Sequence, residues 1–327
     1  MNSDYFSGDL WKYCSSQQIQ ETLRSFCLLD GLPVPPERYF ACLYAVSNHT
    51  ELHYHDVPVQ KKHGGTRILS VPDPLLGTIQ RNILHHVLSE RKGSAYATAY
   101  HKGASVLDNA RPHVGAAQIL KLDIHDFFGS ITFPMVYQYA FPAEYYPPAI
   151  RTLMTALCCR RDCLPQGAPT SPAVSNLVMQ PFDSYMEKWC EERHICYTRY
   201  CDDMTFSGEF DADEVHRKVW GFLHRLGMEL NEQKTRIQRK GVRQSVTGIV
   251  VNEKTQVNRE YRRKLRAEIY CLQKYGAEEE EKTIQRLLGK VNYVLLVNPE
   301  DAYFQKKRDE LKLLQKKNNK MDDREDG

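Results

Sequence analysis

The sequence predicts an α+β fold in which helices at both ends of the chain flank a middle part of short antiparallel strands. Near the N-terminus, the apolar residues Ile19, Leu23 and Phe26 recur at helical spacing. The middle part holds β-prone runs separated by turn residues, and the chain from Arg259 onward is charged and helical in pattern. With 327 residues, 42% of them hydrophobic and 26% charged, the chain is long enough for a sizeable buried core.

The N-terminal part is expected to be helical over residues 1–60, with its first helix ended by Gly31-Leu32-Pro33. Residues 61–72 are expected to form a small hairpin, because Gly64-Gly65 can turn the chain before a β-prone run. A helix is predicted next, with four apolar side chains on one face: Leu76, Ile79, Ile83 and Val87.

The middle part offers three strand predictions. Residues 119–124 form an apolar run that contains Asp123 near its end. Residues 197–206 are aromatic and β-prone on both sides of Cys201-Asp202-Asp203, which predicts a hairpin with carboxylates at its tip. Residues 246–251 are expected to form another strand. The polar stretch 316–327 is expected to be disordered.

Charge is distributed unevenly along the chain. The net charge is only +3, yet residues 234–266 hold eleven Lys or Arg and two Glu. The rest of the chain is therefore net negative. A single basic segment in an otherwise acidic protein is typical of a polyanion bound from one side.

The ten cysteines form no Cys-x-x-Cys pair, and no zinc-site spacing follows the cluster of Cys158, Cys159 and Cys163. We expect free thiols in a reducing cytoplasm. The N-terminus lacks the basic and apolar regions of a signal peptide. No apolar run approaches the ~20 residues that span a bilayer. These patterns predict a soluble cytoplasmic protein without a membrane partner.

Carboxylates stand beside two of the predicted strands, at Asp123 and at Asp202-Asp203. An isolated Asp-Asp pair is usually a solvated turn. Here aromatic and β-prone flanks, with Tyr200 directly before the pair, favour a site. Phosphoryl transfer requires charge neutralisation by two divalent ions about 4 Å apart. Because Mg²⁺ prefers oxygen ligands, clustered Asp residues are typical of such a site.

Four segments follow one another in the order of a known set of motifs. They are 121–131, 164–176 with Gln166-Gly167 and Ser171-Pro172, Tyr200-Cys201-Asp202-Asp203, and 231–235. Residues 121–131 resemble the first metal-binding motif of reverse transcriptases, and 164–176 resemble their Gln-Gly-x-x-x-Ser-Pro element. Tyr200-Cys201-Asp202-Asp203 is similar to their Tyr-x-Asp-Asp motif, and 231–235 to the motif that follows it. The resemblance covers roughly residues 60–300.

Two shorter signatures narrow this resemblance. Asn109-Ala110-Arg111-Pro112-His113 fits the pattern Asn-Ala-x-x-His, and Val246-Thr247-Gly248 reads Val-Thr-Gly. Both are similar to signatures of retron-type bacterial reverse transcriptases. Cys201 stands where Ala is usual, Gly129 where Pro is frequent, and Ala99-Tyr100 where Gly-Phe is frequent. None of these departures removes a candidate metal ligand.

The resemblance implies a right-hand polymerase fold with fingers, a palm built on an antiparallel sheet and a helical thumb. The expected parts are an N-terminal helical segment (1–60), fingers (61–122), a palm with a fingers insertion at about 140–170 (123–250), a thumb (251–315) and a disordered tail (316–327).

The resemblance also assigns the metal site. Asp123, Asp202 and Asp203 would be the catalytic ligands of two Mg²⁺ ions, with Asp203 farther from the second ion. We interpret Asp126 as a turn or helix-cap residue rather than a ligand.

Four residues would bind the deoxynucleotide substrate, according to the same resemblance. Phe128 would pack under the sugar and exclude a ribose, leaving Phe127 in the core. Gln166 would contact the nucleotide, Arg67 would hold the triphosphate, and Lys234 would neutralise or protonate the leaving pyrophosphate. Lys61 and Lys62 are either partners of Arg67 or part of a solvated turn.

Nucleic-acid contacts are expected at the two signatures and on one helix. The first group is Asn109, His113, Thr247 and Gly248, although His113 could equally be a hydrogen-bonded structural residue. The second group recurs at helical steps as a basic face: Arg259, Arg262, Arg263 and Arg266. This face is interpreted as a thumb helix against template–primer phosphates, the alternative being a solvated helix.

The resemblance finally implies a biological setting. Retron enzymes copy part of a cognate structured noncoding RNA, starting from a guanosine 2′-OH, into short single-stranded DNA joined to that RNA. They act in antiphage defence, usually with a separate effector protein. The alternatives are another bacterial reverse transcriptase, of the abortive-infection or diversity-generating kind, and a nucleoprotein scaffold that holds an effector.

Overall fold

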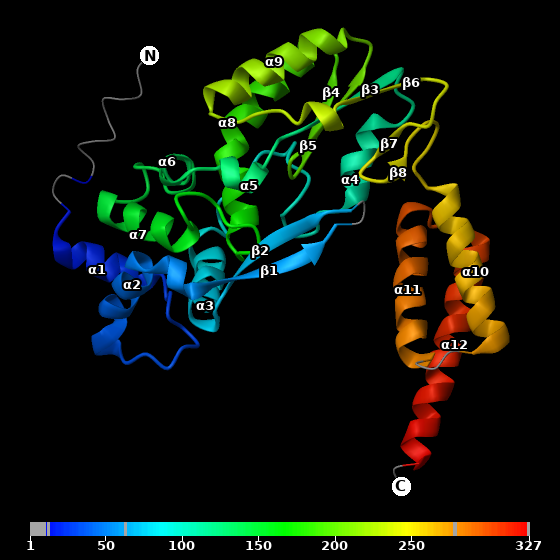
Figure 1. The fold of residues 1–327 in the computed structure, drawn as a ribbon, viewed down its shortest axis with the longest axis horizontal. Coiled ribbons are helices and arrows are strands. Elements are labelled where there is room, and N and C mark those ends of the chain that lie inside the picture. The colour runs from blue at the N-terminus through cyan, green and yellow to red at the C-terminus, as the bar shows by residue number, and fades with distance from the viewer. Residues whose placement is uncertain (1–10, 12–13, 62–63, 277–279, 326–327) are drawn as a thin grey trace.

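The computed structural model describes residue 11 and residues 14–61, 64–276 and 280–325. It is an α+β structure, as expected. Figure 1 shows the N-terminal helices on one side, a central sheet with its helices, and three C-terminal helices set apart on the other side. Within these ranges no helix is both long and apolar enough to cross a membrane. All ten cysteines are free thiols, as predicted.

The N-terminal part is mainly helical. It consists of α1 (Ser16–Ser25), η2 (Pro36–Arg38), α2 (Tyr39–Asn48) and η3 (Thr50–His53). Ser15 begins α1 with a capping box, in which its side chain and that of Gln18 each accept a backbone N–H of the other. Leu23 and Leu43 bury the apolar faces of α1 and α2.

A hairpin of β1 (Tyr54–Gln60) and β2 (Thr66–Pro72) follows. It starts seven residues earlier than predicted, so the expectation of helix over 1–60 is wrong for its last part. The physical reason lies in β1 itself. Val57 and Val59 are β-branched, and Pro58 between them cannot occupy a helix interior but is tolerated on an edge strand.

The principal sheet has the order β4-β5-β3-β6, and all its neighbours are antiparallel. Its strands are β3 (Gln118–Asp123), β4 (Cys196–Tyr200), β5 (Asp203–Gly208) and β6 (Arg236–Arg239). The long helix α8 (Ser171–Glu191) packs on β4, and α9 (Ala212–Arg225) packs on α8. α8 begins at Ser171-Pro172, because Pro fits the first turn of a helix.

Shorter helices complete the region around this sheet. They are α3 (Pro74–Asn82), η4 (Ile83–Val87), α4 (Val106–Ala110), η5 (Arg111–His113), α5 (Phe127–Ser130), α6 (Phe133–Met135), η6 (Val136–Ala140), α7 (Pro148–Cys158) and η7 (Glu232–Lys234). The predicted apolar face of the helix after the hairpin is confirmed, since all four of its side chains are buried.

A small sheet of β7 (Ser245–Val246), β8 (Ile249–Val250) and β9 (Gln256–Val257) leads to the C-terminal helices. The prediction of one strand over 246–251 is wrong. Thr247 and Gly248 have φ of 47° and 85°, and two successive positive φ values make a tight turn between two strands. The segment is therefore a hairpin.

The C-terminal helices are α10 (Arg259–Tyr275), α11 (Glu280–Val297) and α12 (Ala302–Glu325). They share a hydrophobic core with the small sheet and with three side chains of the central region, Leu107, Ala110 and Ile119. A larger cluster fills the rest of the molecule. The tail predicted to be disordered instead continues α12 up to Glu325, because a helix that is already nucleated gains one hydrogen bond for each residue it adds.

Candidate active site

The Asp-Asp pair lies where β4 turns into β5. Tyr200 and Asp203 are opposite each other in the ladder, which leaves Cys201 and Asp202 in the turn. Cys201 has φ of 60°, a conformation that Gly adopts more readily than other residues. On the other side of β5, Asp123 of β3 is opposite Asp203. Pairing of three strands thus brings all three predicted aspartates to one end of the sheet.

Burial and repulsion between carboxylates disfavour the ionised forms of Asp202 and Asp203. The pKa of Asp202 is raised by burial and by the charge of Asp123. Burial, followed by the charge of Asp202, raises the pKa of Asp203 to about 6. Such carboxylates gain from positive charge placed beside them.

Lys234 supplies one such charge. Its Nζ donates to Asp123 Oδ2 at 2.7 Å. Burial alone would lower the pKa of Lys234, but the hydrogen bond and the charge of Asp123 raise it. The other oxygen, Asp123 Oδ1, is buried and has no hydrogen-bond partner. A backbone bond from Asn231 N–H to Asp123 O, at 2.8 Å, fixes the segment that carries Lys234 against β3.

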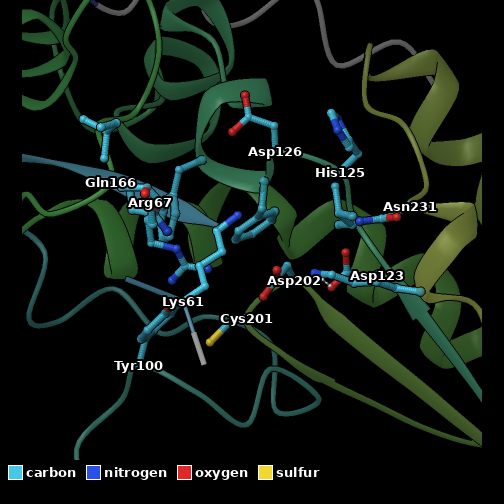
Figure 2. A pocket seen from close by; sticks show the side chains of 16 residues that line it. Lys61, Arg67, Tyr100, Asp123, His125, Asp126, Gln166, Cys201, Asp202 and Asn231 are labelled. Carbon is cyan, nitrogen blue, oxygen red and sulfur yellow. Dashed lines mark hydrogen bonds and ion pairs between the residues drawn. The ribbon is translucent and has the colours of Figure 1, made fainter. Parts of the chain in front are cut away.

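A cavity of about 700 Å³ opens beside Asp123 and Asp202. Figure 2 shows the two aspartates on one side of it, and Lys61, Arg67 and Gln166 on the other. Lys234, Phe128, Tyr100, Cys201, His125 and Asn231 complete much of the lining. Asp203 does not line the cavity. Lys62 lies outside the described residues.

The loop that carries Gln166 is attached to the first hairpin. Ser70 N–H donates to Gln166 O at 2.8 Å. Gly167 has φ of 127°, and a Cβ there would lie 2.8 Å from Ser70 O. No other residue could approach β2 this closely in that conformation. Gln166 and Arg67 are therefore held as one unit, although 99 positions separate them in the sequence.

The two phenylalanines after Asp123 differ in burial. Both border the cavity, but Phe127 is buried in the main core, as expected, while Phe128 is half-buried. Asp126 lines the same cavity, has φ of 41° and precedes α5, and Figure 2 shows its carboxylate pointing away from Asp123 and Asp202. A Cβ on Gly129 would overlap the Asp126 carboxylate at 2.2 Å. Gly129 therefore makes room for that side chain.

Asn109 and His113 are both fully buried beneath the sheet. Thr98 Oγ1 donates to Asn109 Oδ1 at 2.8 Å. The His113 ring lies 2.7 Å from Ser207 Oγ and 2.8 Å from Thr198 Oγ1. Burial lowers the pKa of His113 to about 4. Direct contact with a nucleic acid, which we expected of both residues, is not possible from these positions. They connect η5 and α4 to β4 and β5.

The remaining predicted nucleic-acid residues lie on the C-terminal side. Thr247 donates to Val106 O at 2.9 Å, which ties its turn to α4, while Gly248 is exposed. On α10, Arg259, Arg263 and Arg266 are exposed. Arg262 is only 25% exposed and forms an ion pair with Asp301. Arg262 thus fixes the residue before α12. Its guanidinium is not free to contact a phosphate.

A buried charged group under the Asp-Asp turn was not predicted. The Arg199 side chain is 0% exposed and forms an ion pair with Asp183, which is also 0% exposed. The same guanidinium donates to Asn176 Oδ1 and to Cys201 O. The sequence offered one signal, a charged residue at 199 within a strand otherwise made of apolar and hydroxyl side chains.

The aspartates suit a hard divalent cation as a partial ligand set. Within the described ranges, no three His, Cys, Asp or Glu side chains converge closely enough to enclose an ion by themselves. Mg²⁺ needs only one or two protein carboxylates when substrate phosphates and waters complete its shell. The unpartnered Asp123 Oδ1, beside Asp202 and an open cavity, fits that manner of binding.

Comparison with known proteins agrees with this geometry. The family model described as "Reverse transcriptase (RNA-dependent DNA polymerase)" matches residues 59–261. The retron Mx65 reverse transcriptase of Myxococcus xanthus is 35% identical over 270 residues, which cover 76% of this chain and 62% of that protein. This chain thus spans less than two thirds of the Mx65 protein.

The retron Ec86 reverse transcriptase of Escherichia coli is 30% identical over 253 residues, 76% of this chain and 78% of that protein. Among solved structures, apo telomerase from Candida tropicalis is similar with a TM-score of 0.47 and 10% identity, over 72% of this chain and 52% of that chain. The family match covers more than half of the chain, and most of the Ec86 protein aligns with it. The chain therefore belongs to the retron reverse transcriptases.

Proposed function

We propose that this protein is an RNA-directed DNA polymerase that joins deoxynucleotides by two-metal nucleotidyl transfer. One observation carries the proposal: a single cavity is lined by acidic residues on one side and by basic and polar residues on the other. Asp123 and Asp202 lie opposite Arg67 and Gln166, with Lys234 bonded to Asp123. A nucleoside triphosphate is an anion that needs both metal-binding carboxylates and cationic side chains.

The metal ligands would be Asp123, Asp202 and Asp203, as expected from the sequence. Two Mg²⁺ ions bound there would polarise the phosphoryl group and lower the pKa of the attacking hydroxyl. The aspartates' contribution is negative charge fixed at the end of a sheet. Burial and the neighbouring carboxylates raise the pKa values of Asp202 and Asp203, so positive charge beside them favours their ionised forms.

The other cavity residues bind and orient the substrate. The Arg67 guanidinium can hold triphosphate oxygens through two parallel hydrogen bonds. Lys234 can exchange Asp123 for the leaving pyrophosphate and donate a proton to it. Phe128, half-buried in the lining, would face the sugar and leave no room for a ribose 2′-OH. Gln166 would contact the nucleotide from the fingers side.

The parts of the fold would then divide the work. Residues 61–122 would act as fingers, 123–250 as palm with a fingers insertion near 140–170, and 251–315 as thumb. The exposed Arg259, Arg263 and Arg266 would contact template–primer phosphates. Thr247 and Gly248 lie in the turn next to α10 and would approach the same duplex. Asn109 and His113 are omitted from this interface because they are buried.

The likeness to retron enzymes supports a narrower proposal. The template would be part of a cognate structured noncoding RNA, and the product a short single-stranded DNA linked to that RNA. The biological role would be antiphage defence in the cytoplasm, together with a separate effector protein. Synthesis of an abortive-infection or diversity-generating kind is the nearest alternative, and a nucleoprotein scaffold for the effector is the second.

Expression of the chain with its native flanking DNA tests this proposal. We expect one abundant short DNA whose gel mobility changes after RNase treatment, and its loss in the Asp202→Ala, Asp203→Ala double variant. Activity on an added primer–template without such DNA in cells would indicate another class of reverse transcriptase. Retained effector binding by the inactive double variant would favour a separable scaffold. A product without a 2′,5′ branch would exclude priming from a 2′-OH.

A further inference from the structure

The carboxylate turn has a buried anchor beneath it. Arg199, on β4 just before Tyr200, is fully buried. Its Nε and Nη2 donate to the two Asp183 oxygens at 2.8 and 2.6 Å. This bidentate pairing fixes the plane of the guanidinium. Asp183 belongs to α8 and is also fully buried, so the pair joins the sheet to that helix.

The remaining nitrogen of Arg199 contacts the turn itself. Nη1 donates to Cys201 O at 2.9 Å and to Asn176 Oδ1 at 3.2 Å. Cys201 O belongs to the peptide that leads into Asp202. On the far side of that residue, Ile124 N–H donates to Asp202 O at 3.2 Å. Both carbonyl groups that flank the Asp202 backbone are therefore held by hydrogen bonds.

Asn176 connects this buried cluster to the segment before Tyr100, which lines the cavity. Its Nδ2 donates to Ala99 O at 2.8 Å, one residue before Tyr100, which lines the cavity. Backbone bonds join the same segment to β4, from Arg199 N–H to Tyr96 O and from Thr98 N–H to Arg199 O, each at 2.8 Å. One buried cluster thus connects the carboxylate turn, the Tyr100 segment and α8.

We propose that Arg199, held by Asp183 and Asn176, is a positioning residue that sets the place of the Asp202 carboxylate for the polymerase reaction. The turn needs such a bond because Cys201 adopts a positive φ without being Gly. Without it, the peptide before Asp202 can rotate, and the carboxylate moves with the peptide. This inference rests on the proposed polymerase function.

Two variants remove the bond to the turn without leaving an unpaired buried charge. Arg199→Lys keeps a cation beside Asp183 but loses the planar fork. The double variant Arg199→Gln, Asp183→Asn replaces the ion pair by two neutral amides. The matched control is Tyr197→Phe, which removes a hydroxyl bond to the same Asp183 oxygen, 2.8 Å long, but no contact with the turn.

Three measurements are made on the purified full-length chain: single-nucleotide incorporation on an RNA template with a DNA primer, Mn²⁺ binding by electron paramagnetic resonance, and thermal unfolding. In both Arg199 variants we expect kcat to fall about 100-fold, because small displacements of catalytic groups cost that much. The KM for the deoxynucleotide should stay within about 3-fold, and Mn²⁺ should bind more weakly. Tyr197→Phe should lower the melting temperature and leave kcat and Mn²⁺ affinity unchanged.

Folded Arg199 variants with unchanged kcat and Mn²⁺ affinity would overturn the proposal. An equal loss of kcat in Tyr197→Phe would do so too, and so would Arg199 variants that do not fold, because Arg199 would then serve stability and not position. If the unaltered protein extends no primer, the polymerase function fails instead. The Mn²⁺ titration still decides whether Arg199 positions Asp202.

Discussion

Two hairpins face each other across the active-site cavity and are built in opposite ways. The β4–β5 hairpin carries Asp202 in a two-residue turn, and the middle residues of both its strands are buried. The β1–β2 hairpin carries Arg67, and most of its first strand is exposed. Each is fastened by a buried arginine, Arg199 in one case and Arg160 in the other.

The two arginines differ in what they contact. Arg199 contacts the turn that holds the carboxylate. Arg160 pairs with Glu51 and Asp56 and donates to Ser70 Oγ at 2.7 Å, three residues along β2 from Arg67. Arg67 itself is exposed on β2, and exposed segments open at lower cost than buried ones. Metal ligands need fixed positions, whereas a triphosphate must enter and leave.

The largest effect should come from the rigid hairpin. Asp202→Asn removes a candidate metal ligand but keeps the size of the side chain. Because the charge stabilisation supplied through a metal is worth several kcal/mol, we expect incorporation to fall by at least about 1000-fold. Steady-state primer extension measures this loss. The control is Asp213→Asn, at an exposed position of α9. Wild-type activity of Asp202→Asn would contradict its assignment as a metal ligand.

The polar support of the rigid hairpin should be sensitive to acid. His113 bridges Thr198 of β4 and Ser207 of β5, and its pKa in the fold is about 4 instead of 6.5. Between these pH values the unfolded chain binds the proton and the folded chain does not. Stability from this residue is therefore complete above pH 6.5 and is lost as pH falls towards 4, by about 3 kcal/mol. Chemical unfolding at several pH values measures it.

The same series on His113→Gln isolates the contribution of His113. Asp203, whose folded pKa is raised, changes stability in the opposite direction over the acidic range, so only the difference between the two proteins is informative. We expect the variant to lose less stability than the wild type on acidification. Equal slopes would show that His113 does not titrate on unfolding.

The exposed hairpin should respond through substrate affinity. Arg67→Ala removes a charged donor from the cavity lining, and hydrogen bonds to charged groups contribute about 1.5–3 kcal/mol. We expect the KM for deoxynucleotides to rise about 10- to 100-fold, with a smaller change in kcat. Arg38→Ala, at an exposed position in η2, is the control. A fall in kcat at constant KM would show instead that Arg67, like the residues of the β4–β5 hairpin, acts on the chemical step and not on substrate binding.

Phe128, which lines the cavity, gives the smallest effect. In Phe128→Ala the preference for deoxynucleotides over ribonucleotides should fall about 10-fold, the scale at which a pocket discriminates small groups. Competition between the two substrates measures this ratio. Phe127→Ala is the comparison, and it should instead lower stability by about 3–5 kcal/mol, because Phe127 is in the core. An unchanged ratio in Phe128→Ala would remove its assigned role.

Sequence reasoning predicted the parts of this molecule that local pattern controls. The carboxylate turn, the apolar face over Leu76 to Val87 and the opposite placements of Phe127 and Phe128 all follow from neighbours in the chain. Lys234 reaches Asp123 across 111 positions, and only the order of the motifs indicated that approach. The roles of these residues remain predictions that the variants above test.

The features that were not predicted from the sequence depend on contacts between residues far apart in the chain. The bond between Arg199 and Asp183 arises only when α8 packs on β4. The turn at Thr247 lies inside the segment predicted as a strand. Thr rarely adopts positive φ, and a bond to Val106 O supports it there. Asn109 and His113 were assigned to a nucleic-acid contact from their family signature, whereas they are buried and their partners are hydroxyl groups.

The division of the molecule into two cores has a consequence for its synthesis on the ribosome. Ile119 lies on β3 beside Leu120, yet it belongs to the core completed by residues 246–311. At bacterial elongation rates, on the order of 10 s separates their appearance. During that interval Leu107, Ala110 and Ile119 stay uncovered, and they remain so after the last catalytic motif, 231–235, has been made. The nascent chain thus exposes an apolar, aggregation-prone surface until its last three helices emerge.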